Sequence, residues 1–251
     1  TASSYRPVFD EFSPEIILAL TATPERMDGG NVLADFGSRF TAEIRLPEAL
    51  EEKLLCPFHY FGVADPVSLS DDRFWRNGQY DTLELEKVYT GNHIEARQRL
   101  DAILSALHRY EPDMEGVKGI GFCVSIRHAQ FMAEMFNPRG LASAAYVSGN
   151  DPGHYEPLLN QLKTGQLTFL FTVDKFSEGV DVPEINMVLF LRPTQSLTVF
   201  LQQLGRGLRH APEKECLTVL DFVGQVHKKY RMDLRLKALL PRHRYGIDRE
   251  V

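Results

Sequence analysis

The chain lacks the features that mark several common classes of protein. No apolar run approaches the roughly 18 residues that cross a bilayer, and no basic-then-apolar leader opens the sequence, so we expect a cytoplasmic protein. The three cysteines, Cys56, Cys123 and Cys216, lie far apart without a CxxC pair, which argues against a disulfide scaffold and a zinc site. A net positive charge is absent too. The formal charge is -6, so any contact with nucleic acid must be local.

The composition is that of an ordinary globular protein, with 43% hydrophobic and 25% charged residues among 251. The chain begins with Thr rather than Met, shortly before an apolar stretch. We therefore expect it to be a piece of a longer protein.

The part after Gly116 alternates between apolar strands and amphipathic helices. Strands are predicted at 118–125, 143–149, 167–173, 185–192 and 217–223, and helices at 127–136, 154–165 and 198–208. Apolar strands without polar alternation are typical of a parallel sheet that is covered on both faces. We therefore predict an α/β fold with a parallel sheet, with ligands at the carboxyl ends of its strands.

The part before Gly116 is less regular. Apolar runs predict strands at 16–20, at 40–46 and within 54–63, and the segment 31–40 predicts a helix that stops near Gly37. An exposed loop is expected at 65–82. A helix is predicted at 93–110, because five apolar residues share one helical face: Ile94, Leu100, Ile103, Leu104 and Leu107.

The segment FLQQLGRGLR at 200–209 places Gln202, Arg206 and Arg209 on one helical face. Two permanently charged guanidiniums so close together repel each other unless an anion or a carboxylate lies between them. Forked arginines suit phosphate oxygens, and stabilising a transferring phosphoryl group is a well-attested use of them. The alternative is an exposed helix end with ion pairs to Glu213 or Glu215.

Two loops that follow apolar strands carry further candidates. In FTVDKFSEGVDVP, at 171–183, Gly179 permits a tight turn or close ligand approach, and Asp181 can accept a hydrogen bond from a ribose hydroxyl. In TATPER, at 21–26, Thr21 and Thr23 can relay hydrogen bonds from a phosphate site. An Asp-stabilised turn explains 171–183 equally simply, and plain turn caps are the commoner explanation of 21–26.

The segment 227–249 is basic within an acidic chain. Its basic residues are Lys228, Lys229, Arg231, Arg235, Lys237, Arg242, Arg244 and Arg249. Such a segment can follow phosphates locally, or it can be a packed terminal helix with one solvated face. Trp75 and Tyr80 are either stacking platforms for bases or packing residues.

Taken together, four segments resemble motifs III, IV, V and VI of superfamily 2 helicases of the DEAD/DEAH type: TATPER, GFCVSIRHA (121–129), FTVDKFSEGVDVP and FLQQLGRGLR. The resemblance runs from about residue 16 to 225. Within it, the chain is particularly similar to ATP-dependent helicases related to type III restriction subunits and XPB-like proteins. DEAD-box RNA helicases usually carry His where this chain has Gln202, which favours DNA over RNA as the partner.

The resemblance implies a domain organisation. Residues 1–46 would be the C-terminal tail of a first RecA-like domain, and 47–115 a connector. Residues 116–225 would form a second RecA-like domain of the P-loop NTPase fold, the helicase C-terminal domain, and 226–251 a basic C-terminal helix or extension.

The resemblance also implies roles for individual residues. Arg206 and Arg209 would reach the γ-phosphate of ATP as catalytic residues, with Gln202, Gly179 and Asp181 beside the nucleotide. Nucleic-acid contacts would come from Thr172, Ser125, Arg127, Ser148 and Gly149. Thr21, Ala22 and Thr23 would couple the nucleotide state to the grip on the strand.

No GxxxxGK[ST] phosphate loop (Walker A) occurs in the chain, and we predict that it also lacks the Walker B acid pair for Mg²⁺. ATP and Mg²⁺ would then be held mainly by a missing upstream domain, and this fragment alone would be inactive. We expect part of an ATP-dependent DNA helicase or translocase that does not bind a membrane. The alternatives are a helicase-like module that binds nucleic acid without hydrolysis, and a motor subunit of a restriction system.

Overall fold

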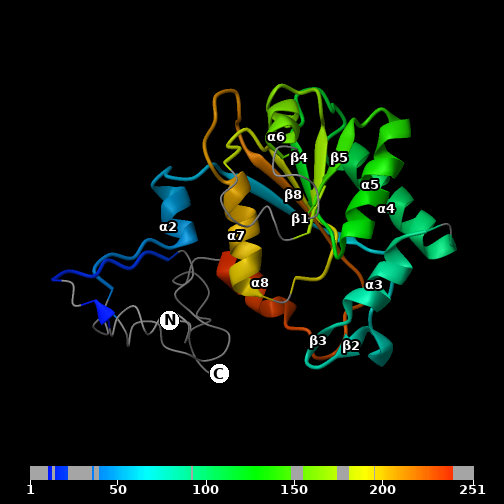
Figure 1. Cartoon of the computed structure of the whole chain (residues 1–251), viewed down its shortest axis with the longest axis horizontal. Helices are drawn as coiled ribbons and strands as arrows, with labels where there is room; N and C mark the ends of the chain where they lie inside the picture. The colour runs from blue at the N-terminus through cyan, green and yellow to red at the C-terminus, as the bar shows by residue number, and fades with distance from the viewer. Residues whose placement is uncertain are drawn as a thin grey trace.

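A six-stranded sheet forms the centre of the fold (Figure 1). The computed structural model describes residues 11–12, 15–21, 36, 40–91, 93–147, 155–173, 181–194 and 196–239. The sheet has the order β1-β8-β7-β4-β6-β5, and every pairing in it is parallel. Its strands are β1 (Phe58–Ala64), β4 (Gly119–Phe122), β5 (Ser143–Tyr146), β6 (Phe169–Thr172), β7 (Met187–Phe190) and β8 (Leu217–Val223). The predicted α/β fold with a parallel sheet is confirmed.

Helices cover both faces of this sheet (Figure 1). On one face, α4 (Ile94–Tyr110) and α5 (Ile126–Phe136) pack on the core. On the other, α6 (Tyr155–Lys163) and α7 (Leu197–Gly207) do so. The smaller helical elements are α2 (Leu46–Glu51), η3 (Asp72–Phe74), α3 (Thr82–Tyr89), η4 (Asn137–Arg139) and α8 (Met232–Leu239). The strands are apolar on both sides because both sides are buried.

Two glycines in β4 make room for aromatic side chains of the neighbouring strand. Gly119 pairs with Phe169 and Gly121 with Phe171. A Cβ atom on Gly119 would lie 2.2 Å from the ring of Phe169, and one on Gly121 would lie 2.4 Å from the ring of Phe171. Both rings pack edge-on against Phe136 of α5, so the glycines allow the aromatic core beneath that helix.

The prediction of strands at 16–20 and 40–46 is wrong. Residues 15–21 and 40–45 contain no strand in the described structure, and Ile16 and Leu20 are 84% and 86% exposed. A strand needs a neighbour that accepts its hydrogen bonds, and no described strand pairs with either segment. The helix predicted at 31–40 falls almost entirely outside the described residues.

Residues 47–115 contribute to the sheet and its cover, which a connector would not do. Strand β1 pairs along its whole length with β8, from Phe58 beside Leu217 to Ala64 beside Val223. The helix predicted at 93–110 is confirmed as α4, but its buried face differs from the predicted one. Ile94 is 71% exposed, whereas Arg99 is buried to 2% exposure. The domain boundaries themselves stay predictions.

The segment 65–82 is an ordered hairpin rather than an exposed loop. Strands β2 (Trp75–Arg76) and β3 (Gln79–Tyr80) are joined by Asn77 and Gly78, which both have positive φ, as a tight hairpin turn requires. Trp75 stacks on the His227 ring at 4.6 Å, and the buried Tyr80 hydroxyl accepts a hydrogen bond from the His227 N–H at 2.8 Å. These aromatic residues therefore pack the hairpin against the C-terminal segment.

The basic C-terminal segment is described as far as residue 239. Lys228 and Lys229 are exposed, and α8 follows them. Leu239, at the end of α8, packs partly against the core on the α7 side of the sheet. Arg242, Arg244 and Arg249 lie outside the described residues.

Candidate nucleotide and nucleic-acid site

The candidate arginines lie at the end of α7. Ser196 caps the start of this helix, where its hydroxyl accepts a hydrogen bond from the Val199 N–H at 3.3 Å. Gln202 is exposed on the helix, and Arg206 is half-buried in its last turn. Helix α7 carries the chain from the carboxyl end of β7 back to the amino end of β8. Its last turn therefore lies by the amino ends of the strands.

Arg209 forms an ion pair with Asp181, a contact between two segments that the sequence had singled out separately. The side chains are 40% and 70% exposed, so water reaches both partners. Burial lowers the pKa of Arg206, the nearby Arg209 guanidinium lowers it further, and Asp181 opposes the shift. The structure thus brings Arg206, Arg209 and Asp181 together. The contact it shows for Arg209 is with Asp181 rather than with the predicted alternatives, Glu213 and Glu215.

A lysine that the sequence did not single out joins these two segments. The Lys214 ammonium donates hydrogen bonds to the carbonyls of Pro183 at 3.0 Å, Gly207 at 2.6 Å and Arg209 at 2.9 Å. A single lysine between a helix and a strand carries no pattern signal in the sequence. The only indication in the sequence that Lys214 lies near the arginines is its spacing of five residues from Arg209.

The described nucleic-acid candidates lie at the opposite end of the sheet. Ser125 and Arg127 follow β4, and Thr172 ends β6, the strand beside β4. Ser125 caps α5, where its hydroxyl accepts from the His128 N–H at 3.1 Å. The Arg127 side chain is 71% exposed and lies 3.9 Å from Glu86. Thr172 is fully buried, and its hydroxyl has no hydrogen-bond partner among the residues that the structure describes.

The remaining candidates are only partly described. Thr21 is exposed, whereas Ala22, Thr23, Ser148, Gly149 and Gly179 lie outside the described residues. The prediction that the chain contains no DExx acid pair for Mg²⁺ disagrees with the sequence at one place, because residues 10–13 read DEFS. Glu11 of this string is exposed, and Asp10 lies outside the described residues.

The candidate residues therefore form two groups at opposite ends of the sheet. Ser125, Arg127 and Thr172 lie at carboxyl ends, as expected for ligands of an open parallel sheet. Arg206 and Arg209 do not follow that rule. The Cys56 N–H, just before β1, donates to the Leu208 carbonyl at 2.8 Å, which fixes this region at the amino ends of the strands.

A buried charge network lies beneath the carboxyl ends of the strands. The Arg99 guanidinium donates to the Asp65 carboxylate at 2.7 Å and to the Leu191 carbonyl at 2.8 Å, and it contacts His128 Nε2 at 3.3 Å. It also covers the Tyr89 ring at 3.7 Å from the ring centre. Burial acts to lower the pKa of Arg99, but Asp65 and Tyr89 outweigh it, so the pKa is raised. This network joins the ends of β1 and β7 to the start of α5.

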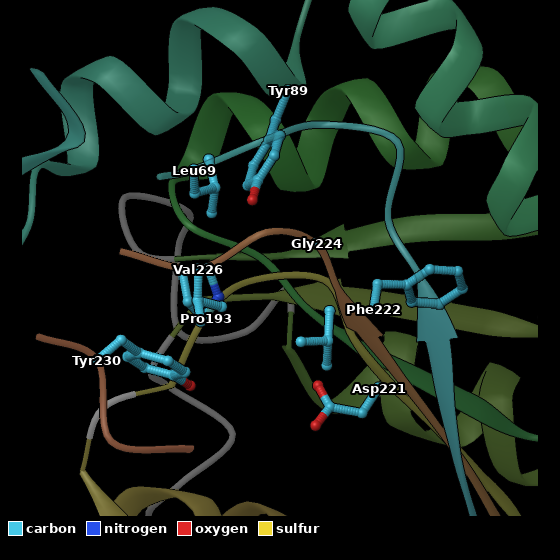
Figure 2. A pocket seen from close by; sticks show the side chains of 9 residues that line it. Leu69, Tyr89, Pro193, Asp221, Phe222, Gly224, Val226 and Tyr230 are labelled. Atoms are coloured by element: carbon cyan, nitrogen blue, oxygen red, sulfur yellow. The ribbon is translucent and has the colours of Figure 1, made fainter. Parts of the chain in front are cut away.

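Figure 2 shows a pocket beyond the end of β8, lined by Leu69, Tyr89, Pro193, Asp221, Phe222, Val223, Gly224, Val226 and Tyr230. Its lining is mostly apolar, and its one charged side chain, Asp221, is an acid that pairs with the Tyr60 hydroxyl. A phosphate needs donors or positive charge, and none of the lining side chains is a cation. The pocket therefore does not fit a nucleotide phosphate.

Within the described residues, no His, Cys, Asp and Glu side chains gather in a group of three or more that could hold a metal ion. Within those residues, no helix has the length and apolar character to cross a membrane.

The sheet order, the helices on both faces and the two groups of polar residues define a RecA-like α/β domain. Residues 98–211 match the family model described as the helicase conserved C-terminal domain. Over these residues the chain therefore matches the C-terminal domain of superfamily 2 helicases. The match begins within α4 and continues through α7 and the Arg206–Arg209 segment.

Known proteins support the same assignment. The chain is 24% identical over 230 residues to IRC3 of Saccharomyces cerevisiae, which is named as an ATP-dependent helicase. It is 27% identical over 244 residues to the type I restriction enzyme EcoAI endonuclease subunit of Escherichia coli. These alignments cover 89% and 88% of this chain but only 32% and 29% of the relatives, so the chain spans about a third of their length.

A solved structure has the same fold. It is a fragment from Vibrio vulnificus YJ016, named as an HsdR subunit of a type I restriction enzyme. The two chains share 21% sequence identity with a TM-score of 0.65, over 87% of this chain and 42% of the other.

Proposed function

We propose that this chain is the C-terminal motor segment of an ATP-dependent DNA helicase or translocase. In this proposal a missing upstream domain holds ATP and Mg²⁺, and Arg206 and Arg209 reach the triphosphate as arginine fingers. The fragment alone does not hydrolyse ATP, because no phosphate loop occurs in it. The helicase relative supports ATP as the fuel, and the restriction-enzyme relative supports DNA as the track.

The contact between Arg209 and Asp181 is the observation that carries the proposal. Two guanidiniums on one helix end repel each other, and burial together with Arg209 lowers the pKa of Arg206. An anion between them relieves that repulsion. Because the Arg209–Asp181 pair is exposed, exchanging Asp181 for a phosphate oxygen requires little free energy. Asp181 is then released toward a ribose hydroxyl.

The other candidates have supporting roles in this proposal. Gln202 and Gly179 lie beside the nucleotide, and Thr21, Ala22 and Thr23 couple the nucleotide state to the strand. The strand is bound by Ser125, Arg127, Thr172, Ser148 and Gly149. Thr172 is buried, so its hydroxyl reaches a phosphate only after a conformational change that exposes it. The hydroxyl has no hydrogen-bond partner within the described part of the chain, which supports a partner gained in another state.

Substitution of Arg209 in the complete protein tests the proposal. Arg209→Ala should lower the nucleic-acid-stimulated turnover number by about 10³-fold or more, because an arginine finger acts mainly in the transition state. ATP binding should remain close to that of the unsubstituted protein. The measurement is steady-state ATPase with single-stranded DNA, duplex DNA and RNA, combined with equilibrium binding of a labelled nucleotide.

Arg139→Ala is the matched control, because Arg139 is an exposed arginine that donates to the Met135 carbonyl, away from α7. It should leave turnover unchanged. Normal turnover of the Arg209→Ala protein would sink the proposal. Nucleic-acid binding without ATPase in the unsubstituted complete protein would favour the non-hydrolysing module.

The relation to a type I restriction subunit gives a second candidate, the motor subunit of a restriction system. That function requires nuclease residues elsewhere in the complete protein. ATP-dependent cleavage of duplex DNA by the complete protein would favour it, and strand separation or translocation without cleavage would favour the helicase.

A further inference from the structure

Lys214 lies between the end of α7 and the start of β8, and all of its hydrogen-bonding capacity is used. An ammonium has three protons, and the three accepting carbonyls belong to Pro183, Gly207 and Arg209. The preceding residue, Glu213, has a φ of 65°, a left-handed conformation that is unfavourable for a residue with a side chain. The chain thus adopts an unusual backbone geometry immediately before this lysine.

The three carbonyls come from two segments far apart in the sequence. Gly207 is the last residue of α7, where carbonyls have no partner within the helix and a positive charge is favourable. The Arg209 carbonyl belongs to the residue whose side chain pairs with Asp181. Pro183 lies two residues after Asp181. One ammonium therefore binds the backbone on both sides of the Arg209–Asp181 ion pair.

The side-chain pair alone does not fix these segments. Arg209 and Asp181 are 40% and 70% exposed, and exposed ion pairs contribute little. Hydrogen bonds from a charged donor to backbone carbonyls are stronger. Lys214 is half-buried, and burial lowers the pKa of its ammonium, as expected for a cation packed among protein groups.

We propose that Lys214 is a positioning residue, which fixes the Asp181 segment against the Arg206–Arg209 segment so that both arginines are already placed for a triphosphate. The proposal rests on the function proposed above. Lys214 contacts no substrate in it and acts through the backbone of Arg209. When the upstream domain closes on ATP, the arginines then need no rearrangement of their own segment.

The test uses the complete protein with Lys214→Met, which keeps the aliphatic stem and removes all three donors. The expected result is a turnover number lowered about 10- to 100-fold, because a small misplacement of a catalytic group has effects of that size. The KM for ATP should change by less than about threefold, because the lost interaction acts on the transition state. Lys214→Arg, which keeps the charge and several donors, should recover part of the lost turnover.

Lys87→Met is the matched control, because Lys87 is an exposed lysine that pairs with Glu84 on α3. It should have normal turnover. Circular dichroism and a urea unfolding curve establish that each variant is folded under assay conditions. Lys214→Gln, which keeps two donors, replaces the methionine variant if that protein does not fold. Failure of both to fold would assign Lys214 to stability alone and overturn the positioning role.

Combining Lys214→Met with Arg209→Lys separates positioning from a general structural effect. If Lys214 acts through Arg209, the double variant should lose much less turnover than the product of the two single losses. Fully independent losses would overturn the proposal.

The single variants distinguish the two proposals. Normal turnover of Lys214→Met beside an inactive Arg209→Ala would overturn the role of Lys214 and leave the proposed function standing. Normal turnover of Arg209→Ala would overturn the proposed function itself.

Discussion

Two arginine–aspartate ion pairs lie at opposite ends of the same sheet, and their surroundings differ completely. Arg99 and Asp65, at the carboxyl ends, have side chains only 2% and 3% exposed. Arg209 and Asp181, at the amino ends, are 40% and 70% exposed. The buried guanidinium also binds the Leu191 carbonyl and covers the Tyr89 ring, whereas the pair at the amino ends can exchange with solvent. The same two residue types thus serve two different purposes.

The comparison indicates that burial determines whether an ion pair fixes one geometry or leaves its arginine available for another anion. A buried pair whose partners are fully hydrogen-bonded fixes one geometry, because breaking it leaves an uncompensated charge. An exposed pair contributes little to stability, so its arginine remains available for another anion. The proposed function therefore requires a ligand to replace Asp181, and nothing comparable can happen at the buried Asp65.

The largest expected effect is on the buried pair. Arg99→Met should lower the free energy of unfolding by about 3–5 kcal/mol, because Asp65 is left charged and buried. Urea unfolding followed by circular dichroism measures this. The double variant Arg99→Met with Asp65→Leu should recover part of the loss, since no unpaired charge remains. A loss below about 1 kcal/mol for Arg99→Met would show that the buried pair stabilises the fold no more than the exposed pair does, which would contradict the comparison.

A smaller effect concerns the histidine in the buried network. Burial, and then the charges of Arg99 and Arg192, hold the pKa of His128 well below its ordinary value of 6.5. The unfolded chain therefore binds a proton at His128 below pH 6.5, and the folded chain does not. Stability from this group is complete above pH 6.5 and decreases as the pH falls below it.

Urea unfolding at a series of pH values from about 8 to 5 measures the decrease, whose slope for one proton is at most about 1.4 kcal/mol per pH unit. His128→Gln should make the slope smaller. An identical slope in that variant would show that other groups cause the pH dependence.

The smallest expected effect is on the exposed pair. Arg209→Met and Asp181→Asn should each change the free energy of unfolding by less than about 1 kcal/mol. The same urea experiment as for Arg99 measures both variants. A loss comparable to that of Arg99→Met would show that the pair at the amino ends is structural, and the comparison would fail.

Much of the fold was predictable because it depends on local apolar patterns. The five strands after Gly116 and the helix at 94–110 follow from runs and periodicity that a parallel sheet and an amphipathic helix require. The run at 16–20 has the same composition as a strand, yet it is exposed. A short apolar run does not encode whether a neighbouring strand exists, so its environment could not be predicted.

The site was predictable only in part, for a different reason. The Arg206–Arg209 segment and Asp181 each carried a pattern, and the structure joins them. Arg99 and Lys214 carried none, because their importance comes from partners far away in the sequence, such as Asp65 and Pro183. Patterns reveal residues that repeat or cluster along the chain, and they do not reveal single residues that bind distant backbone.

The neighbouring strands β1 and β8 have a consequence for how the chain acquires its structure. Strand β1 precedes all the other strands of the sheet, and its pairing partner β8 is the last to follow. During synthesis from the N-terminus, β1 therefore has no pairing partner among the described strands until the chain has been made as far as Val223. Contacts of such long sequence separation slow folding, so the edge of the sheet should form late. A shortened chain of residues 98–211 would contain neither strand, and β7 would be left as an unprotected edge open to association.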